Sequence, residues 1–379
     1  MNNKTKKWIL CFIFIVLALP GLNHKLQFIK SGPLNGSFRA IVDTDFAVGD
    51  WIRGTYQRRK ELYLNDETGF RPDLVRLNNQ VDYSFFDKCH ANWTIKGKDG
   101  YLFQIPYINA YYGLDYCGYP SILDRAKKIK AIQDTFRRLG KSLILAYLPS
   151  KASSYPEYFP DDRVEPNIGP TNYQSFRHVC DSLGINQVDM NAWFVQMKNK
   201  SKEPLFTKQG IHWSEYGAIL GGDSLIKYIE KLRNIHILHP RWSRTEHTDK
   251  LRDGDDDIAQ ELNLIFPFAK ETAAYPIIED VPDSGQKKIN AIYIGDSYTF
   301  KMVGDGIINK MNAQCEFWYY FNEVHEINGG KFTYIAFYDW QGAVDKADCV
   351  VVAYTIFNLW QLGNGFIERE YDHFYPHGQ

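Results

Sequence analysis

The chain has 379 residues, a formal net charge of -1 and a charged fraction of 23%. This length suffices for one large α/β domain or two ordinary ones. A net charge so close to zero gives no electrostatic basis for nucleic-acid binding, so no nucleic-acid partner is expected. Aromatic residues make up 15% of the chain. Such rings often line carbohydrate sites, although at any single position a packed core or surface ring is the commoner role.

The N-terminus has a pattern typical of export or membrane anchoring. Lysines within residues 4–7 precede an apolar run over residues 8–19, which a Pro-Gly pair closes. The run is short for a membrane span and fits a signal-peptide core. Residues 17–22 contain no small-x-small cleavage site, however, which favours an uncleaved anchor. We predict that residues 1–22 are a signal anchor or signal peptide that contacts the membrane, with everything after it exported.

Residues 23–60 have weak periodicity and are expected to form a juxtamembrane linker, so the domain would begin near residue 61. Apolar residues at helical spacing between Leu74 and Phe85 predict an early amphipathic helix. Residues 97–103 read Gly-Lys-Asp-Gly-Tyr-Leu-Phe, which is typical of a hairpin turn that enters a strand.

Strand and helix patterns then alternate along the chain. Helices are predicted from Ile122 to Leu139 before a terminating glycine, and from Ser214, a good N-cap, through residue 232. The remaining predicted elements are strands over 142–148, 186–189, 289–294, 316–320 and 348–354, and helices over 171–183 and from 297 to about 311. This alternation predicts an α/β fold with a parallel central sheet flanked by helices.

The segment 240–288 is charged and loop-like, and we predict a surface insertion between two halves of one domain covering residues 61–379. It contains an acidic cluster, Asp253 with Asp255–Asp257, for which a solvated loop is favoured over a calcium site. Five of the six cysteines lie outside the apolar N-terminal run, so they cannot all pair within one chain. A pair between Cys89 and Cys117 stays open, with free buried thiols favoured. No cysteine spacing suggests a metal site.

The clearest chemical signal is a strand-to-helix turn near the C-terminal end. An apolar run stops at Gly295, and Asp296 and Ser297 follow before a helical pattern begins. This order places a hydroxyl at the carboxyl edge of a sheet, above helix N–H groups that can stabilise an oxyanion. A serine needs a base to become a nucleophile, and His212 lies 85 residues upstream. Together they predict acyl transfer by a Ser/His enzyme without a metal or cofactor.

Five segments in order resemble the alginate O-acetyltransferase family of the AlgJ/AlgX type, a branch of the SGNH-hydrolase-like fold. They read Asn-Asp-Glu-Thr-Gly-Phe-Arg at 65–71, Gly-Lys-Asp-Gly-Tyr-Leu-Phe at 97–103, Leu-Pro-Ser-Lys followed by Tyr-Pro-Glu within 148–157, His-Trp with Gly-Ala within 212–218, and Gly-Asp-Ser at 295–297. Only the second segment is specific by itself. The resemblance extends from about residue 60 to residue 368.

The resemblance implies acetylation of hydroxyl groups on an extracellular or cell-envelope polysaccharide. The catalytic domain would be periplasmic and anchored in the inner membrane. Ser297 would carry the acetyl group as an ester, and His212 would shuttle the proton. The acetyl donor would act through a multispanning membrane acyltransferase, which is therefore an expected partner.

One position departs from the family pattern. The family has an aspartate two residues before the histidine, where this chain has Gly210. An orienting carboxylate can be worth orders of magnitude in rate, so another group must replace it if the site is active. Asp189, Glu215, Asp223 and a backbone carbonyl are all open. The missing aspartate also leaves a non-catalytic polysaccharide-binding component as an alternative, and an esterase of the same fold is a further one.

Further oxyanion or substrate candidates flank the two residues or follow strand ends, namely Gly295, Asp296, Tyr298, Asn358, Lys151, Trp213 and Arg71. Asn358 follows the last strand and would add an oxyanion donor. Lys151 follows an earlier strand, where α/β sites usually form, and would bind an anionic group. Trp213 and Tyr298 would form the floor of a sugar site. Arg71 would contact substrate or, more commonly for such a residue, form a structural ion pair.

Overall fold

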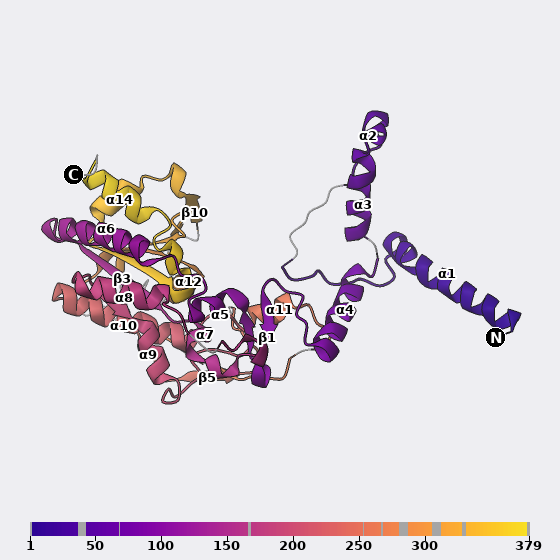
Figure 1. The fold of residues 1–379 in the computed structure, drawn as a ribbon, viewed down its shortest axis with the longest axis horizontal. Coiled ribbons are helices and arrows are strands. Elements are labelled where there is room, and N and C mark those ends of the chain that lie inside the picture. The colour runs from indigo at the N-terminus through magenta and orange to yellow at the C-terminus, as the bar shows by residue number, and fades with distance from the viewer. Residues whose placement is uncertain are drawn as a thin grey trace. The chain divides into compact units, whose positions relative to one another are not determined.

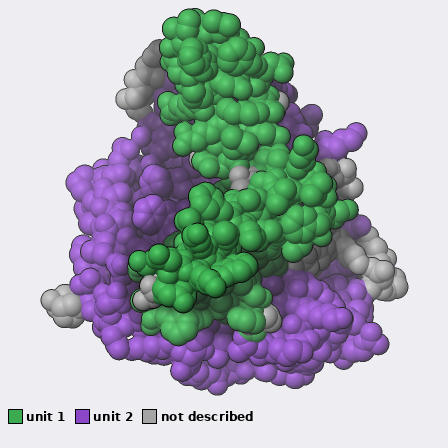
Figure 2. All heavy atoms as spheres, turned by 90° about the vertical axis from the view of Figure 1, so that its right-hand side faces the viewer, with its two compact units in different colours: residues 1–91, 259–268 green, residues 92–258, 269–379 purple. Residues whose placement is uncertain are grey.

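The computed structural model describes residues 2–36, 43–67, 69–165, 168–252, 254–266, 268–279, 287–304, 312–327 and 331–376. The chain divides into two compact units, which Figure 2 colours separately. The first contains residues 1–91 and 259–268, and the second contains residues 92–258 and 269–379. Residues 61–91, which we expected within the catalytic domain, therefore fall in the first unit.

The first unit is helical. Its long helices are α1 (Asn3–Leu26), α3 (Thr55–Glu67) and α4 (Arg71–Phe86), with the short α2 (Val48–Ile52) between them. Helix α1 has 24 residues and contains an 18-residue window with a mean hydropathy of 1.9, enough by length and composition to cross a membrane, although a signal sequence would meet the same test. Helix α4 confirms the amphipathic helix, whereas α2 and α3 occupy much of the segment predicted to be a linker.

The second unit is built on a seven-stranded sheet with the order β10-β9-β8-β7-β11-β3-β4 (Figure 1). Its strands in chain order are β3 (Ser142–Leu148), β4 (Gln187–Asp189), β7 (Ile289–Gly295), β8 (Asn312–Tyr319), β9 (Glu323–Glu326), β10 (Lys331–Tyr334) and β11 (Cys349–Thr355). The five strands from β8 to β4 are parallel, and β9 and β10 run antiparallel to their neighbours. The sheet is therefore mixed and not wholly parallel as predicted. Residues 320–322 turn directly from β8 into β9, and such a short turn joins only antiparallel strands.

Helices cover both faces of the sheet. One face packs in a single apolar cluster with α6 (Tyr119–Arg138), α8 (Asn172–Ser182), α13 (Trp340–Lys346) and α14 (Phe366–Phe374). Alternate β3 residues, such as Leu143 and Leu145, point into that cluster, and Ile144 between them is equally buried. Burial on both faces explains why β3 reads as a continuous apolar run.

Three helices that matter for the site are α9 (Met190–Met197), α10 (Glu215–Arg233) and α12 (Ser297–Gly304). Ser214 is the N-cap of α10 as predicted, because its Oγ accepts the Gly217 N–H at 3.0 Å. Helix α12 contacts α10, β7, β8 and β11. Its predicted extension over residues 305–311 lies outside the described residues.

Smaller elements complete the second unit. Strands β1 (Thr94–Lys96) and β2 (Leu102–Gln104) form the hairpin expected at residues 97–103. Strands β5 (Thr245–Thr248) and β6 (Ala273–Pro276) pair antiparallel inside the segment that we predicted to be loop-like, so this segment is partly ordered as a ribbon. All six cysteines lie within the described residues, and none of them forms a disulfide there.

Candidate active site

The turn between β7 and α12 places Ser297 at the carboxyl end of the sheet. Gly295 is the last residue of β7, and a Cβ at this position would collide with the carbonyl oxygen of Ala353 and with the side chain of Thr299. The absence of a side chain therefore lets α12 pack directly against β11. Ser297 is the first residue of α12, so its N–H is one of those left unpaired by the helix itself.

Asp296 fixes this turn from beneath. Its side chain is fully buried, and its Oδ2 accepts hydrogen bonds from the Thr355 N–H at 2.9 Å, the Thr355 hydroxyl at 2.6 Å and the Asn358 Nδ2 at 2.8 Å. Its Oδ1 accepts the Tyr298 N–H at 3.2 Å. We predicted that Asn358 would be an oxyanion donor, but its amide is bonded to Asp296. Asn358 therefore positions the turn that carries Ser297.

His212 joins Ser297 to an acid. Its Nε2 lies 2.9 Å from the Ser297 Oγ, and its Nδ1 lies 2.8 Å from the Asp257 Oδ2. The tautomer that satisfies both contacts has Nδ1–H donating to the carboxylate and Nε2 accepting from the serine hydroxyl. This is the arrangement of a Ser-His-Asp triad.

Asp257 is the carboxylate that the sequence analysis did not find. It begins α11 (Asp257–Glu261), and its Oδ1 accepts the N–H groups of Ile211 and Ile258, each at 2.8 Å. Burial raises the pKa of Asp257, but the hydrogen bonds from His212 and these two N–H groups outweigh it, and the net pKa lies below its ordinary value. The carboxylate is therefore ionised at neutral pH and suited to orient the imidazole.

The predicted replacements for the family aspartate have other partners. Asp189 accepts the Tyr173 hydroxyl and caps α9, and Asp223 accepts from His239 at 2.7 Å. Gly210 itself has no room for a side chain, because a Cβ there would lie 2.7 Å from the carbonyl oxygens of Gly254 and Asp255. The backbone that leads to Asp257 thus occupies the space beside Gly210.

The acidic cluster is not a solvated loop. Asp255 is fully buried, with Oδ1 2.5 Å from the Lys301 Nζ and Oδ2 accepting the Tyr275 hydroxyl at 2.9 Å. This pair ties the loop before Asp257 to α12, about one turn from its start. Within the described residues no group of histidines, cysteines and acids could hold a metal ion, and Asp253 lies outside them.

Three further candidates lie in the core beside the site. Lys151 is 1% exposed, and its Nζ donates to the carbonyls of Thr207, Lys208 and Gly210. Burial lowers the pKa of Lys151 to about 7. Trp213 and Tyr298 have no exposed surface, so they cannot form the floor of a sugar site, and Lys151 is not placed to bind an anion. Tyr298 instead supports His212, since its ring centroid lies 4.9 Å from the imidazole.

Arg71 belongs to the first unit. It pairs with Asp66 in that unit, with Nη2 and Oδ1 3.2 Å apart. Of the two roles considered for Arg71, a substrate contact and a structural ion pair, this contact matches the ion pair. Thr68, within the same predicted segment, lies outside the described residues.

A cavity of about 540 Å³ opens beside the serine. Besides His212 and Ser297, its described lining contains side chains that the sequence analysis did not single out, namely Phe300, Lys301, Tyr319, Glu323 and His325. Tyr319 comes from β8, and Glu323 and His325 come from β9, an antiparallel strand that the sequence analysis did not predict. A polar strand such as Glu-Val-His-Glu gives little signal in a sequence.

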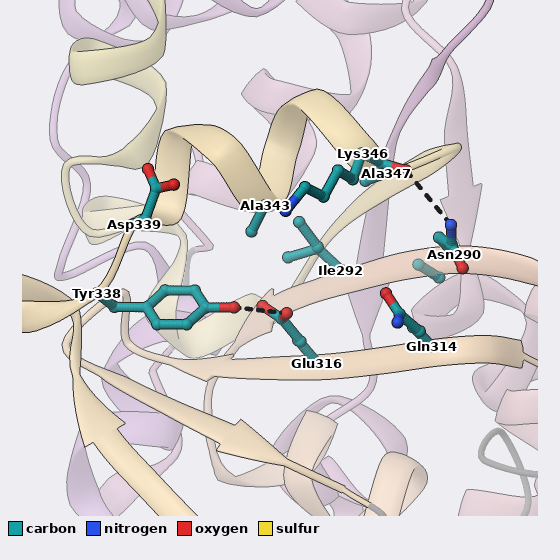
Figure 3. A pocket seen from close by; sticks show the side chains of 10 residues that line it. Asn290, Ile292, Gln314, Glu316, Tyr338, Asp339, Ala343, Lys346 and Ala347 are labelled. Atoms are coloured by element: carbon teal, nitrogen blue, oxygen red, sulfur yellow. Dashed lines mark hydrogen bonds between the residues drawn. The ribbon is translucent and has the colours of Figure 1, made fainter.

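A second cavity, of about 330 Å³, lies toward the amino ends of β7 and β8 (Figure 3). Figure 3 shows Tyr338 pointing at Glu316, whose Oε1 accepts the tyrosine hydroxyl at 2.6 Å. The described lining of this cavity contains no serine, histidine or cysteine. The first cavity is therefore the candidate active site, at the end of the strands where α/β proteins usually bind ligands.

Comparisons with known proteins agree with this fold. The model of the family described as "SGNH hydrolase-like domain, acetyltransferase AlgX" matches residues 94–281, a range that includes His212 and Asp257. The chain is 26% identical over 215 residues to "Probable alginate O-acetylase AlgJ" of Pseudomonas aeruginosa, covering 56% of this chain and 48% of that protein. It is 31% identical over 98 residues to the protein of the same name from Azotobacter vinelandii, covering 26% of this chain and 24% of that one. The matches thus span about half the length of these curated relatives, or less.

A solved structure supports the architecture beyond the range of the family model. The "O-Acetyltransferase Domain of Pseudomonas putida AlgJ" superposes with a TM-score of 0.50 at 17% identity. The match covers 74% of this chain and 99% of that one. The chain belongs to the alginate O-acetyltransferase family of the AlgJ/AlgX type and has the SGNH-hydrolase-like α/β fold.

Proposed function

We propose that this protein is an O-acetyltransferase that acetylates hydroxyl groups of a cell-envelope polysaccharide through an acetyl ester on Ser297. The observation that carries the proposal is the hydrogen-bonded series from Asp257 through His212 to the Ser297 hydroxyl, with contacts of 2.8 and 2.9 Å. It supplies a nucleophile, a base and an orienting acid beside an open cavity. Membership of the AlgJ/AlgX family makes acetyl the expected acyl group.

In the first proposed step, His212 Nε2 takes the hydroxyl proton as the Ser297 Oγ attacks the acetyl carbonyl carbon of the donor. The carbonyl oxygen becomes negative, and the Ser297 N–H at the start of α12 is placed to stabilise it. One such donor is typically worth about 3 kcal/mol of transition-state stabilisation. The tetrahedral intermediate then collapses, the leaving group takes the proton from His212, and the acetyl group stays on Ser297.

In the second step, a sugar hydroxyl enters the cavity and His212 removes its proton while its oxygen attacks the acetyl-serine. Collapse returns the proton from His212 to the Ser297 Oγ and releases the acetylated sugar. Throughout, Asp257 stabilises the imidazolium and keeps Nδ1 protonated. The non-catalytic alternative was based on the missing family aspartate and the abundant aromatics, and the position of Asp257 beside His212 supports the catalytic role instead.

The proposed location is the cell envelope. Helix α1 would act as an inner-membrane anchor or a signal, with the second unit on the periplasmic side. A donor that supplies acetyl groups from the other side of the membrane would then require a multispanning acyltransferase as partner, as the resemblance implies.

The test is to incubate the full chain in detergent with p-nitrophenyl acetate and to follow intact mass and nitrophenolate release. We expect a single acetyl adduct that Ser297→Ala abolishes and His212→Ala slows by about a thousandfold. Ser121→Ala, at an exposed serine of α6, serves as the matched control and should not change the rate. An adduct that persists in folded Ser297→Ala protein would refute the acyl-enzyme. Added polysaccharide then distinguishes transfer from the hydrolysis expected of an esterase.

A further inference from the structure

The antiparallel edge of the sheet has an aromatic face that continues from the active-site cavity. In the strand register, Glu323 lies opposite Tyr319 on β8 and Tyr334 on β10. His325 in the same way lies opposite Phe332 on β10. Directly opposed residues share a face of a sheet, and residues two apart in a strand do so as well. These five side chains therefore lie on one surface, which we call the aromatic ledge (Tyr319, Glu323, His325, Phe332 and Tyr334).

Ring contacts connect the ledge to the nucleophile. Phe300 lies one helical turn after Ser297, and its ring centroid is 5.6 Å from that of His325. His325 stacks on Phe332 with centroids 5.4 Å apart and an interplanar angle of 23°, and Phe332 meets Tyr334 edge-on at 5.8 Å. The path thus runs from the cavity wall to the outer strand of the sheet.

The outer part of the ledge is open to solvent. Phe332 is 56% exposed and Tyr334 is 47% exposed, although burial of large aromatic rings is favourable. Glu323 lies between the rings with its side chain 27% exposed, and it has one carboxylate oxygen beyond the one that contacts His325. Exposed ring faces with a carboxylate between them match a pyranose chain, whose C–H faces stack on rings and whose hydroxyls donate to carboxylates.

The charges of the site argue against an anionic sugar. Lys301 Nζ pairs with Asp255 at 2.5 Å, and His325 Nε2 pairs with Glu323 at 3.0 Å. His212 has Asp257. Lys301 is therefore offset by Asp255, and each histidine in the described lining faces a carboxylate that would offset a charge on its ring. A polyuronate crossing the ledge would therefore meet the Glu323 carboxylate and no excess of positive charge among the described residues of the lining.

We propose that the aromatic ledge binds the acceptor polysaccharide and that this acceptor is a neutral pyranose chain, not a uronate polymer such as the alginate named for the relatives. The inference rests on the proposed function, because it assigns the acceptor of the same acetyl-serine. It predicts that the ledge affects transfer to sugar without affecting acetylation of Ser297.

The experiment uses the full chain with p-nitrophenyl acetate as donor and separate hexasaccharide acceptors. Neutral acceptors are glucose-, mannose- and N-acetylglucosamine-based, and the anionic acceptor is mannuronate hexasaccharide. We expect transfer to at least one neutral acceptor and a rate at least about tenfold lower with mannuronate. The Phe332→Ala/Tyr334→Ala double variant should lower transfer at least about tenfold, while its rate of Ser297 acetylation stays within about twofold.

Two further variants make the result specific. Phe337→Ala removes a ring that is 85% exposed and adjoins Tyr338 of the amino-end cavity, so transfer should not change. Glu323→Gln should raise transfer to mannuronate by about tenfold relative to transfer to the neutral acceptor, since it removes the repelling charge. Equal or preferred transfer to mannuronate, no transfer to any acceptor from an acetylated enzyme, or an unaffected double variant would each overturn the inference. Failure of Ser297 to become acetylated would instead refute the proposed function.

Discussion

Two cavities are both lined by residues of β8, and only one of them has a nucleophile and a base in its described lining. Toward the amino ends, Glu316 accepts both the Tyr338 hydroxyl and the Trp318 Nε1, at 2.6 and 2.9 Å, so its charge is used within the wall. At the carboxyl ends, the contacts from Asp257 lead outward and finish on a hydroxyl that faces the cavity. The presence of polar groups therefore does not identify the site. The direction in which their hydrogen bonds lead does.

The largest expected effect comes from replacing Asp257, the acid of the Ser-His-Asp triad. Asp257→Asn keeps the shape of the side chain but presents an amide that stabilises the wrong imidazole tautomer. We expect the rate of Ser297 acetylation to fall by about 10³ to 10⁴, measured by nitrophenolate release. The matched control is Asp223→Asn, because Asp223 contacts His239 at 2.7 Å in a similar pair away from the cavity. A folded Asp257→Asn protein within tenfold of wild type would show that Asp257 is not the orienting acid.

A smaller loss is expected from restoring the family residue. Gly210→Asp places a Cβ 2.7 Å from the carbonyl oxygens of Gly254 and Asp255, which forces the backbone before Asp257 to move. We expect the protein to lose about 2 to 3 kcal/mol of unfolding free energy, as overpacking typically costs. Displacing Asp257 should also slow acetylation by about a hundredfold.

Gly32→Asp is the control for the glycine substitution, since its nearest neighbour is an Arg76 side-chain nitrogen at 4.0 Å. The decisive comparison is the Gly210→Asp/Asp257→Asn double variant. Wild-type activity in that protein would mean that an aspartate two residues before His212 can still act here. The steric argument for a relocated acid would then be wrong.

Ser297 and Asp257 show how much of the site could be predicted from the sequence. Ser297 was found because its strand, turn and helix are contiguous, and the helix N-terminus above a sheet edge is a local pattern. Asp257 was missed because its role depends on a fold contact between residues 45 apart. Within an acidic run it resembled a solvated charge, and nothing local indicates that Asp255 is buried against Lys301.

The predictions for Lys151 and for the edge of the sheet failed for related reasons. A lysine after a strand was expected to face the site, but its side chain points to three carbonyls in the interior, a direction that depends on tertiary packing. Strands β3, β7 and β11 were predicted because they are almost entirely apolar and buried on both faces. Strand β9 has polar residues on the ledge side and gave no signal, so the antiparallel edge and its aromatic face appear only in the structure.

A weaker effect should appear in the pH dependence of stability. The pKa of Asp257 in the folded protein lies below its ordinary value of 3.8, so the folded state favours the ionised carboxylate. This contribution to stability is present above the ordinary pKa and is lost as the pH falls through the lowered one. The difference in unfolding free energy between wild type and Asp257→Asn should therefore be largest near neutral pH and shrink below about pH 4. A difference that stays constant from pH 3 to pH 7 would contradict the ionised acid.

The smallest effect on activity is expected at the amino-end cavity. Glu316→Gln retains one oxygen but replaces the other with an amide that cannot accept from Tyr338 or Trp318. Burial raises the pKa of Tyr338, so its hydroxyl remains a donor at neutral pH and is left unsatisfied. We expect a loss of about 1 to 3 kcal/mol in unfolding free energy, measured by denaturant titration. Acetylation of Ser297 should remain within about twofold, because this cavity shares β8 with the active-site cavity and the described hydrogen bonds of Glu316 do not reach the triad. A tenfold loss of acetylation in folded protein would mean instead that the position of β7 transmits the change to Ser297, and the two cavities would have to be treated as one coupled system.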